Sequence, residues 1–217
     1  MLRSPPSIAM RSVAVSVAWC VAWALSALGA PARAQSSADG VYGRLSGDLV
    51  LSVEGHGGVM RTAGGTEGAL GAALRARSLD MTGVALGYDR ALGAARYDAL
   101  WAAVDLRPAF FARWASDLER GPRWVDLLLD SLGIELGAVW VRPGADGLRG
   151  FGMVLGGGVE IPLVWRAGDG ATLRLGARYF AVRPWDQRGT GRDDSAVEIT
   201  AGLVLRQTVT GGLVRAR

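Results

Sequence analysis

The segment that decides the fold is Phe151-Gly-Met-Val-Leu-Gly-Gly-Gly-Val-Glu-Ile-Pro-Leu-Val-Trp165. Its odd-numbered residues are large and apolar except Gly157, whereas its even-numbered residues are mostly small and include Glu160. Because side chains alternate between the two faces of a strand, this period of two predicts a β-strand with one apolar face. The run is much longer than the usual globular strand of roughly 5 or 6 residues, and aromatic residues stand at both its ends. The pattern is typical of a strand that crosses a membrane.

The same alternation recurs along the chain and predicts eight strands. Leu49, Leu51 and Val53 begin the series, and the predicted strands cover residues 48–54, 70–77, 83–88, 100–107, 133–140, 151–165, 173–179 and 197–205. No apolar run after residue 34 reaches the roughly 18 to 20 residues of a membrane helix, and open sheet edges cannot stay unpaired in lipid. The sequence therefore predicts an all-β fold, an eight-stranded antiparallel up-and-down transmembrane β-barrel, which is the smallest bacterial outer-membrane size.

The predicted connections differ in length at the two ends of the barrel. Tight turns at 80–81 and 167–170 alternate with longer connections, rich in Gly, Arg and Asp, at 55–68, 89–97, 142–150 and 183–195. Short periplasmic turns and longer external loops are typical of outer-membrane barrels. The connection 112–131 is long on the periplasmic side, and Trp124–Leu129 predicts a short amphipathic helix there. Pro108 and Pro162 cannot donate to strand pairing, so they predict strand ends or bulges on that side.

The first 34 residues have the features of a signal peptide. Two arginines, Arg3 and Arg11, precede the uncharged apolar stretch Val13–Leu28, and Ala32-Arg33-Ala34 fits a small-x-small cleavage site. The alternative is an uncleaved membrane anchor, since the apolar stretch is nearly long enough to span a bilayer. We predict a signal peptide at residues 1–34 and an outer-membrane β-barrel domain at residues 35–217.

The charge balance of the predicted mature chain excludes a general nucleic-acid binder. Removing the three signal arginines leaves 24 minus 3, or 21, basic residues against 20 acidic ones. The single cysteine, Cys20, lies within the predicted signal peptide, so the barrel has neither a disulfide nor a thiol. We expect no nucleic-acid partner.

The polar face of the strands decides which side of the barrel faces the lumen. It consists mainly of Gly and Ala interrupted by charges, and a solvated outer face would have no use for so many strand-weakening glycines. An eight-stranded barrel is just wide enough for its lumen to be filled by side chains. The alternative is a secreted, soluble, lipocalin-like ligand-binding barrel with its apolar face inside. We predict a lumen charge network made of Asp48, Glu54, Arg75, Arg77, Asp105, Arg107, Glu135, Glu160, Arg174, Arg178 and Glu198.

Strands such as Ala196-Val-Glu-Ile-Thr-Ala-Gly-Leu203 carry a resemblance in overall plan to a known group. The chain resembles the small eight-stranded outer-membrane β-barrel proteins of Gram-negative bacteria, similar to the OmpA transmembrane domain and OmpW-like proteins. The resemblance implies export to the outer membrane, insertion by the outer-membrane assembly machinery, and contact with lipid and lipopolysaccharide. We predict a non-enzymatic role in envelope structure or surface binding. The lumen charges form either a closed salt-bridge network, which we favour because eight strands leave little free cross-section, or the lining of a narrow pore.

One histidine raises an enzymatic alternative. Some small barrels are lipid-modifying enzymes that use a His with a Ser or an acid near the outer surface, and His56 has Ser52 and Glu54 nearby in sequence. His56 is followed by Gly57-Gly58, so the His-x-Ser pattern of such deacylases is absent. We therefore predict a solvated histidine in the first external loop, and we expect no catalytic residue, no metal site and no cofactor.

Overall fold

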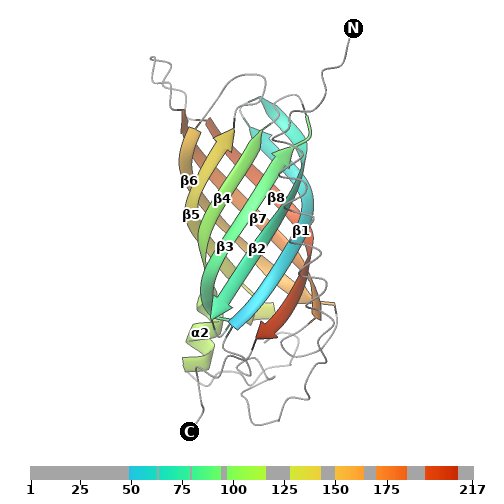
Figure 1. Cartoon of the computed structure of the whole chain (residues 1–217), viewed down its shortest axis with the longest axis vertical. Helices are drawn as coiled ribbons and strands as arrows, with labels where there is room; N and C mark the ends of the chain where they lie inside the picture. The colour runs from blue at the N-terminus through green and yellow to red at the C-terminus, as the bar shows by residue number, and fades with distance from the viewer. Residues whose placement is uncertain are drawn as a thin grey trace. The chain divides into compact units, whose positions relative to one another are not determined.

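Eight antiparallel strands form one closed barrel in the computed structural model (Figure 1). The structure describes residues 49–62, 64–78, 80–93, 97–115, 128–142, 150–163, 170–184 and 194–209. The strands are β1 (Leu49–Thr62), β2 (Gly65–Ser78), β3 (Thr82–Ala91), β4 (Asp98–Leu106), β5 (Gly133–Arg142), β6 (Gly150–Pro162), β7 (Gly170–Pro184) and β8 (Asp194–Val209). Each strand pairs with the next, and β1 pairs with β8 to close the barrel. The predicted fold is confirmed.

The faces of the strands are also as predicted. On β6, Phe151, Met153 and Leu155 point outward and are 54%, 61% and 53% exposed, while Val154 and Glu160 point inward and are buried. The same division holds around the barrel, with the exposed Leu and Ile residues outside and the buried arginines inside. The soluble lipocalin-like alternative is therefore wrong, because it requires the reverse arrangement.

The first connection is a correction to the sequence analysis. Residues 55–68 are not a long loop: β1 continues to Thr62, β2 begins at Gly65, and these two residues pair. Thr62 Oγ1 accepts a hydrogen bond from the backbone N–H of Gly64, and Gly65 has a φ of 138°, which a side chain would disfavour. The glycines of this stretch permit a tight hairpin. The alternation of large apolar residues is interrupted at these glycines, although the strand continues through them.

The other predicted connections are described only in part. The turn at Asp80-Met81 is confirmed, and the backbone N–H of Met81 donates to the carbonyl of Ser78. The third connection begins later than predicted, because Asp89 lies within β3. Residues 143–149, 164–169 and 185–193 lie outside the described residues, as does the predicted signal peptide.

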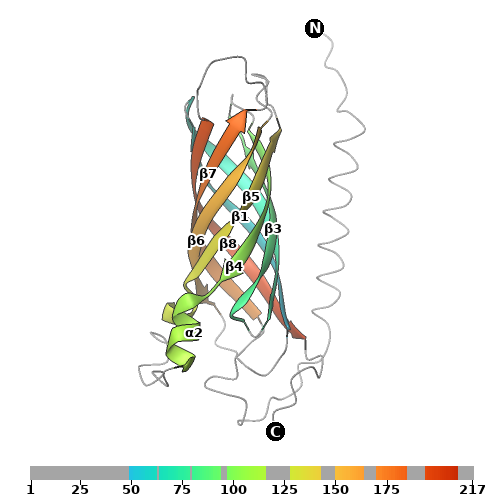
Figure 2. The same cartoon turned by 90° about the vertical axis from the view of Figure 1, so that its left-hand side faces the viewer.

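The fourth connection begins with a helix that the sequence analysis did not predict. Helix α2 (Pro108–Ala115) lies at the end of the barrel where β4 ends (Figure 2). Pro108 occupies its first position, where a missing N–H costs nothing and the fixed φ favours a helix. Pro162 is the last residue of β6, so both prolines mark strand ends. Of the predicted helix at 124–129, only residues 128 and 129 are described, and they begin a helical turn. No helix among the described residues is long and apolar enough to span a membrane.

Candidate functional site

The lumen is the only part of the described barrel where charged side chains gather out of contact with solvent. The predicted lumen charges that the structure describes are all buried inside the barrel: Glu54, Arg75, Arg77, Asp105, Arg107, Glu135, Glu160, Arg174, Arg178 and Glu198. Asp48 lies outside the described residues. His56, Asp80 and Asp89, which the sequence analysis did not place in the lumen, are buried as well. Asp130, shortly before β5, is a further buried carboxylate. Arg206, mostly buried, joins this network as well.

The half of the lumen nearer α2 is filled by charged side chains, and we call it the ionic layer. It comprises Arg75, Arg77, Asp80, Asp105, Arg107, Glu135, Glu160, Arg174 and Arg206. Glu160 is one centre of this layer. Its Oε1 accepts from Arg77 at 2.8 Å and from Arg174 at 3.2 Å, and its Oε2 accepts from Arg107 at 2.7 Å. These partners come from different parts of the barrel, so a single carboxylate ties distant strands together.

Glu135 is the second centre of the ionic layer. Its Oε1 accepts from Arg75 Nη2 at 2.8 Å and from Arg174 Nη2 at 2.7 Å, and its Oε2 accepts from Arg178 Nε at 3.0 Å. Because Arg174 bridges Glu135 and Glu160, the two centres form one network. Buried charges are tolerated only when they are paired and hydrogen-bonded in this way.

Asp80 closes the ionic layer at the turn between β2 and β3. Its backbone has a φ of 56°, a left-handed conformation that Asp tolerates better than most residues. Its Oδ2 accepts from Arg107 at 2.8 Å and from Arg206 at 2.6 Å. Burial acts to raise the pKa of Asp80, but the guanidinium groups of Arg107 and Arg206 outweigh it and lower that pKa to about 2. The turn is thus fastened to β8 and to the end of β4 by charge.

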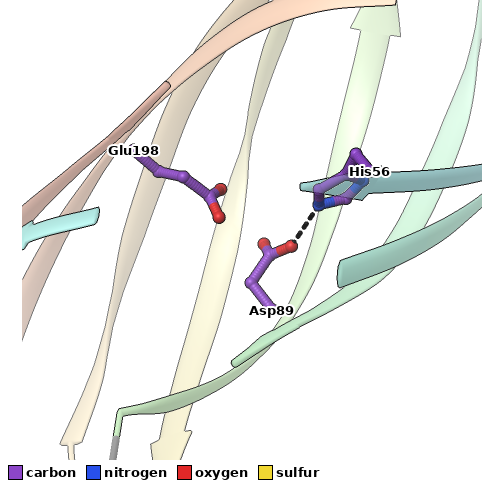
Figure 3. Close-up of side chains that lie close together, drawn as sticks. All are labelled: His56, Asp89 and Glu198. Atoms are coloured by element: carbon purple, nitrogen blue, oxygen red, sulfur yellow. Dashed lines mark hydrogen bonds and ion pairs between the residues drawn. The ribbon is translucent and has the colours of Figure 1, made fainter. Parts of the chain in front are cut away.

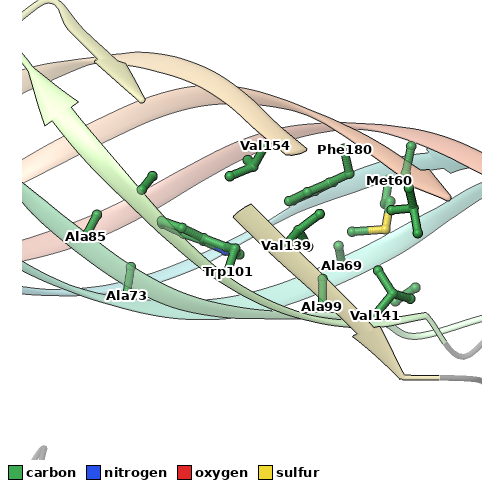
Figure 4. Close-up of a cluster of buried hydrophobic side chains, with 14 residues drawn as sticks. Met60, Ala69, Ala73, Ala85, Ala99, Trp101, Val139, Val141, Val154 and Phe180 are labelled. Carbon is green, nitrogen blue, oxygen red and sulfur yellow. The ribbon is translucent and has the colours of Figure 1, made fainter. Parts of the chain in front are cut away.

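The opposite half of the lumen is filled by hydrocarbon, and we call it the apolar layer. It comprises Met60, Ala69, Ala91, Ala99, Val139, Val141, Phe180, Val182 and Ala196, several of them drawn in Figure 4. Met60, Val139 and Phe180 have no solvent-accessible surface. These residues belong to the ends of the strands away from α2, where β1 meets β2 at the first hairpin. Side chains therefore close the lumen at this end as well.

Between the two layers lies a boundary cluster, defined as Glu54, His56, Asp89, Trp101, Arg178 and Glu198. Trp101 Nε1 donates to Asp89 Oδ2 at 2.6 Å, and the Arg178 guanidinium stacks over the Trp101 ring at 4.4 Å. Gly87 makes this packing fit, because a Cβ there would lie 2.1 Å from the indole ring. The indole joins the ionic layer to the apolar layer, since its ring packs and its N–H is bonded.

His56 is the centre of the boundary cluster, and its predicted position in a solvated external loop is wrong. It lies on β1, only 6% exposed, and faces the lumen. Its Nδ1 is 3.0 Å from Glu54 Oε1, and its Nε2 is 2.5 Å from Asp89 Oδ1. Both ring nitrogens therefore meet carboxylates. Ser52, the other residue of the enzymatic alternative, also lies in the lumen.

The parity of three of the missed residues would have placed them in the lumen if the predicted strands had been extended. His56 has the same parity as Glu54, Asp89 the same parity as Gly87, and Arg206 the same parity as Val204. Extending three predicted strands by one or two residues places all three in the lumen. Asp80 carried no such signal, because its burial depends on the arginines that reach the turn.

Comparisons with known proteins add little to this geometry. No known protein family matches the sequence, and no curated protein matches it. Among solved structures, the N-terminal β-barrel domain of Pseudomonas aeruginosa OprF is similar with 10% identity and a TM-score of 0.47, over 74% of this chain and 99% of that one. The outer-membrane protein OprG from Pseudomonas aeruginosa is similar with 12% identity and a TM-score of 0.45, over 75% of this chain and 97% of that one.

A third similar structure is Ail, the attachment invasion locus protein of Yersinia pestis, solved with the heparin analogue sucrose octasulfate. It has 10% identity and a TM-score of 0.39, over 74% of this chain and 99% of that one. The closed eight-stranded barrel of the present chain confirms the fold that its resemblance to small outer-membrane barrels implies. At these identities and TM-scores the matches carry no argument about its activity.

Proposed function

We propose that this chain is an integral outer-membrane β-barrel protein with an occluded lumen and a non-enzymatic role in envelope structure or surface binding. The observation that carries the proposal is the inversion of its two faces. The outward face presents half-exposed Leu, Val and Ile on every strand, whereas the inward face holds the buried Arg, Asp and Glu. Apolar patches of this extent are unfavourable in water and favourable in hydrocarbon.

The filled lumen supports a protein that does not conduct. The ion pairs of the ionic layer join side chains that are at most about a tenth exposed, and most are 0–3% exposed. The apolar layer at the other end fills the lumen with Met, Val, Phe and Ala side chains, which do not bind a passing ion. Eight strands leave little free cross-section, and here side chains occupy it. The narrow pore considered from the sequence has no observation in its favour.

The position of His56 supports a non-enzymatic role. A lipid-modifying site must be reached by lipid at the outer surface, and His56 is enclosed by the lumen with both ring nitrogens beside carboxylates. A general base needs a free nitrogen within reach of the proton that it accepts. We propose outer-membrane lipid, lipopolysaccharide and the outer-membrane assembly machinery as the partners.

The membrane placement is tested by fractionation and by gel mobility. We expect the chain in the outer-membrane fraction of a Gram-negative host and, in detergent, faster migration on an unheated gel than after boiling. Recovery from the soluble periplasm together with identical mobility in both gels would overturn the proposal. In a soluble chain, the outward face would have no contact with lipid.

The outward face is tested by one substitution with a matched neighbour. Leu155→Arg places a charge on the lipid side near mid-strand, and we expect it to cost about 2–4 kcal/mol in lipid vesicles. Leu155→Val keeps that position apolar and serves as the control. Equal stability of the two variants by urea titration would show that this face does not meet hydrocarbon.

The occluded lumen is tested by planar bilayer recordings of the purified full chain. We expect no conductance steps above those of the empty bilayer. Discrete, reproducible steps would assign a pore to the lumen and would leave the membrane placement intact.

A further inference from the structure

Three side chains of the boundary cluster converge on one point in the lumen. His56 on β1, Asp89 on β3 and Glu198 on β8 each direct a nitrogen or oxygen toward the others (Figure 3). Their potential ligand atoms all lie within 4.8 Å of one another, and all three residues are buried. One imidazole and two carboxylates are ligands that zinc accepts.

Each of these side chains has its other polar atom close to a separate partner. His56 Nδ1 faces Glu54 Oε1 at 3.0 Å, Asp89 Oδ2 accepts from Trp101 at 2.6 Å, and Glu198 Oε2 accepts from Arg178 at 3.3 Å. The atoms left facing the point of convergence are His56 Nε2, Asp89 Oδ1 and Glu198 Oε1. Outer partners of this kind orient metal ligands, and a metal ion here would take the place of the proton that lies between His56 Nε2 and Asp89 Oδ1.

The cluster also has unused binding capacity. Glu198 is 0% exposed, and its Oε1 has no hydrogen-bond partner among the described residues. A buried carboxylate oxygen without a partner is costly. Gly71 lies directly against the cluster, and a Cβ there would come within 2.3 Å of both His56 Nε2 and Asp89 Oδ1. Glycine at this position therefore allows the two atoms to lie together against β2.

The local charges favour a bound cation. Glu54, Asp89 and Glu198 surround His56, and the arginine shared by this group is Arg178, which lies 3.3 Å from Glu198 and 3.7 Å from Asp89. Glu54 has Arg75 as a further partner. Arg174 also lies 3.7 Å from Glu54, whereas Asp89 and Glu198 share the one guanidinium group of Arg178. At these two carboxylates, either a proton on His56 or a metal ion supplies the missing positive charge.

We propose that His56 Nε2, Asp89 and Glu198 bind a divalent transition-metal ion, with zinc as the best match to one nitrogen and two oxygen ligands. Tetrahedral zinc with bonds of about 2.0–2.1 Å requires its ligand atoms to be about 3.3 Å apart. His56 and Asp89 must separate slightly from their 2.5 Å contact, and Glu198 must approach. The nitrogen ligand distinguishes zinc from calcium and magnesium, which prefer oxygen.

The closed lumen determines how the ion would enter. Ionic and apolar layers flank the cluster on its two sides, and neither offers an open path. The ion is therefore taken up while the barrel closes, and it then stabilises the folded state by mass action. Zinc present during folding is expected to remain bound after free zinc is removed.

The experiment uses the full chain without a histidine tag, refolded from urea into detergent with zinc and then desalted. We expect about one zinc per chain, as for a site with three protein ligands. His56 is the only histidine of the chain, so ¹⁵N-histidine labelling gives a single pair of ring signals. Zinc should shift the Nε2 signal while Nδ1 stays protonated. A zinc content near zero with unchanged ring signals overturns the proposal.

Variants separate this site from general binding to carboxylates. Asp89→Asn and Glu198→Gln are expected to lose the bound zinc, and Asp105→Asn, a matched buried carboxylate in the ionic layer, is expected to retain it. Trp101→Phe removes the donor to Asp89 and should weaken zinc binding by about 10-fold or more when the chain is refolded with zinc and a competing chelator both present. Gel mobility without heating shows which variants fold. Equal zinc retention by folded wild type, Asp89→Asn and Glu198→Gln overturns the proposal, and if neither variant folds, the Nε2 signal of the wild type decides.

Discussion

The two halves of the lumen solve the same packing problem with different chemistry. Both fill the interior of one barrel of constant strand number, yet the ionic layer uses arginines and carboxylates whereas the apolar layer uses Met, Val, Phe and Ala. The apolar half needs only the right volume at each position. The ionic half needs every charge to find several partners, as Glu160 does with Arg77, Arg107 and Arg174. The lumen of a narrow barrel must therefore be filled by side chains, and the type of side chain determines how a substitution there destabilises the protein.

Failure differs because the two layers lose different things when a side chain is removed. An apolar truncation loses contacts and leaves a cavity. Removal of one carboxylate leaves arginines buried without their counter-charge, which costs more than the pair contributes. The same comparison applies to the outer rim, where Arg90 and Asp98 form an ion pair with side chains that are 42% and 27% exposed.

The largest expected effect is at Glu160. Glu160→Gln removes the carboxylate that Arg77, Arg107 and Arg174 share. Their other partners, Asp105, Asp80 and Glu135, then carry all the compensating charge in a dry interior, and we expect a loss of about 3–5 kcal/mol in the free energy of unfolding. Urea titration of the chain folded in lipid vesicles measures it. A loss below about 1 kcal/mol would mean that water reaches the ionic layer, and the contrast between the layers would disappear.

A smaller loss is expected in the apolar layer. Val139→Ala removes two methyl groups at a position with no exposed surface, and we expect a cost of about 2 kcal/mol from lost contacts and the cavity. This loss should be the same in low and high salt, since no charge is involved. A cost equal to that of Glu160→Gln would show that volume alone governs both layers.

Acid should weaken the ionic layer through Asp80. Its pKa is about 2 in the folded barrel against an ordinary 3.8, so it contributes stability that is fully present above about pH 4 and is lost as pH falls toward 2. We expect this contribution to be about 2 kcal/mol. Comparison of unfolding between pH 5 and pH 2 should show a shallower acid loss in Asp80→Asn than in the wild type. Parallel curves would remove Asp80 from the acid response.

The smallest effect is expected at the rim pair. Asp98→Asn breaks an ion pair that solvent screens, although Asp98 also accepts from the Tyr88 hydroxyl at 3.0 Å. We expect a cost below about 1 kcal/mol, and less in high salt. A cost matching that of Glu160→Gln would show that burial is not what distinguishes the ionic layer.

Much of the fold could be predicted because strand parity is a local property. Leu155 and Glu160 differ in parity, and their opposite faces follow from that alone. Gly156 and Gly158, among small neighbours, indicated which face lay inside. The ends of strands were harder: the glycines at 55, 57 and 58 resembled a loop, and pairing with β8 holds them in β1.

The candidate metal site could not be predicted in the same way. His56, Asp89 and Glu198 lie on three strands, and no spacing between them resembles a ligand motif. β1 and β3 are separated by β2, and His56 and Asp89 are both in register with Gly71 of β2, so their side chains meet on the lumen side of that glycine. The curvature of the closed barrel creates this contact, and a single strand contains no information about it.

The sequence by itself determined the strand number, the inward and outward faces and the set of charges that enter the lumen, because side-chain direction alternates along each strand regardless of its neighbours. Only the tertiary structure decided which of those charges meet and where the ionic layer gives way to the apolar one. Stagger and closure set the height of each side chain in the lumen, and these depend on all eight strands together. His56 lies at the height where the two layers meet, which turned a predicted loop residue into the centre of the boundary cluster.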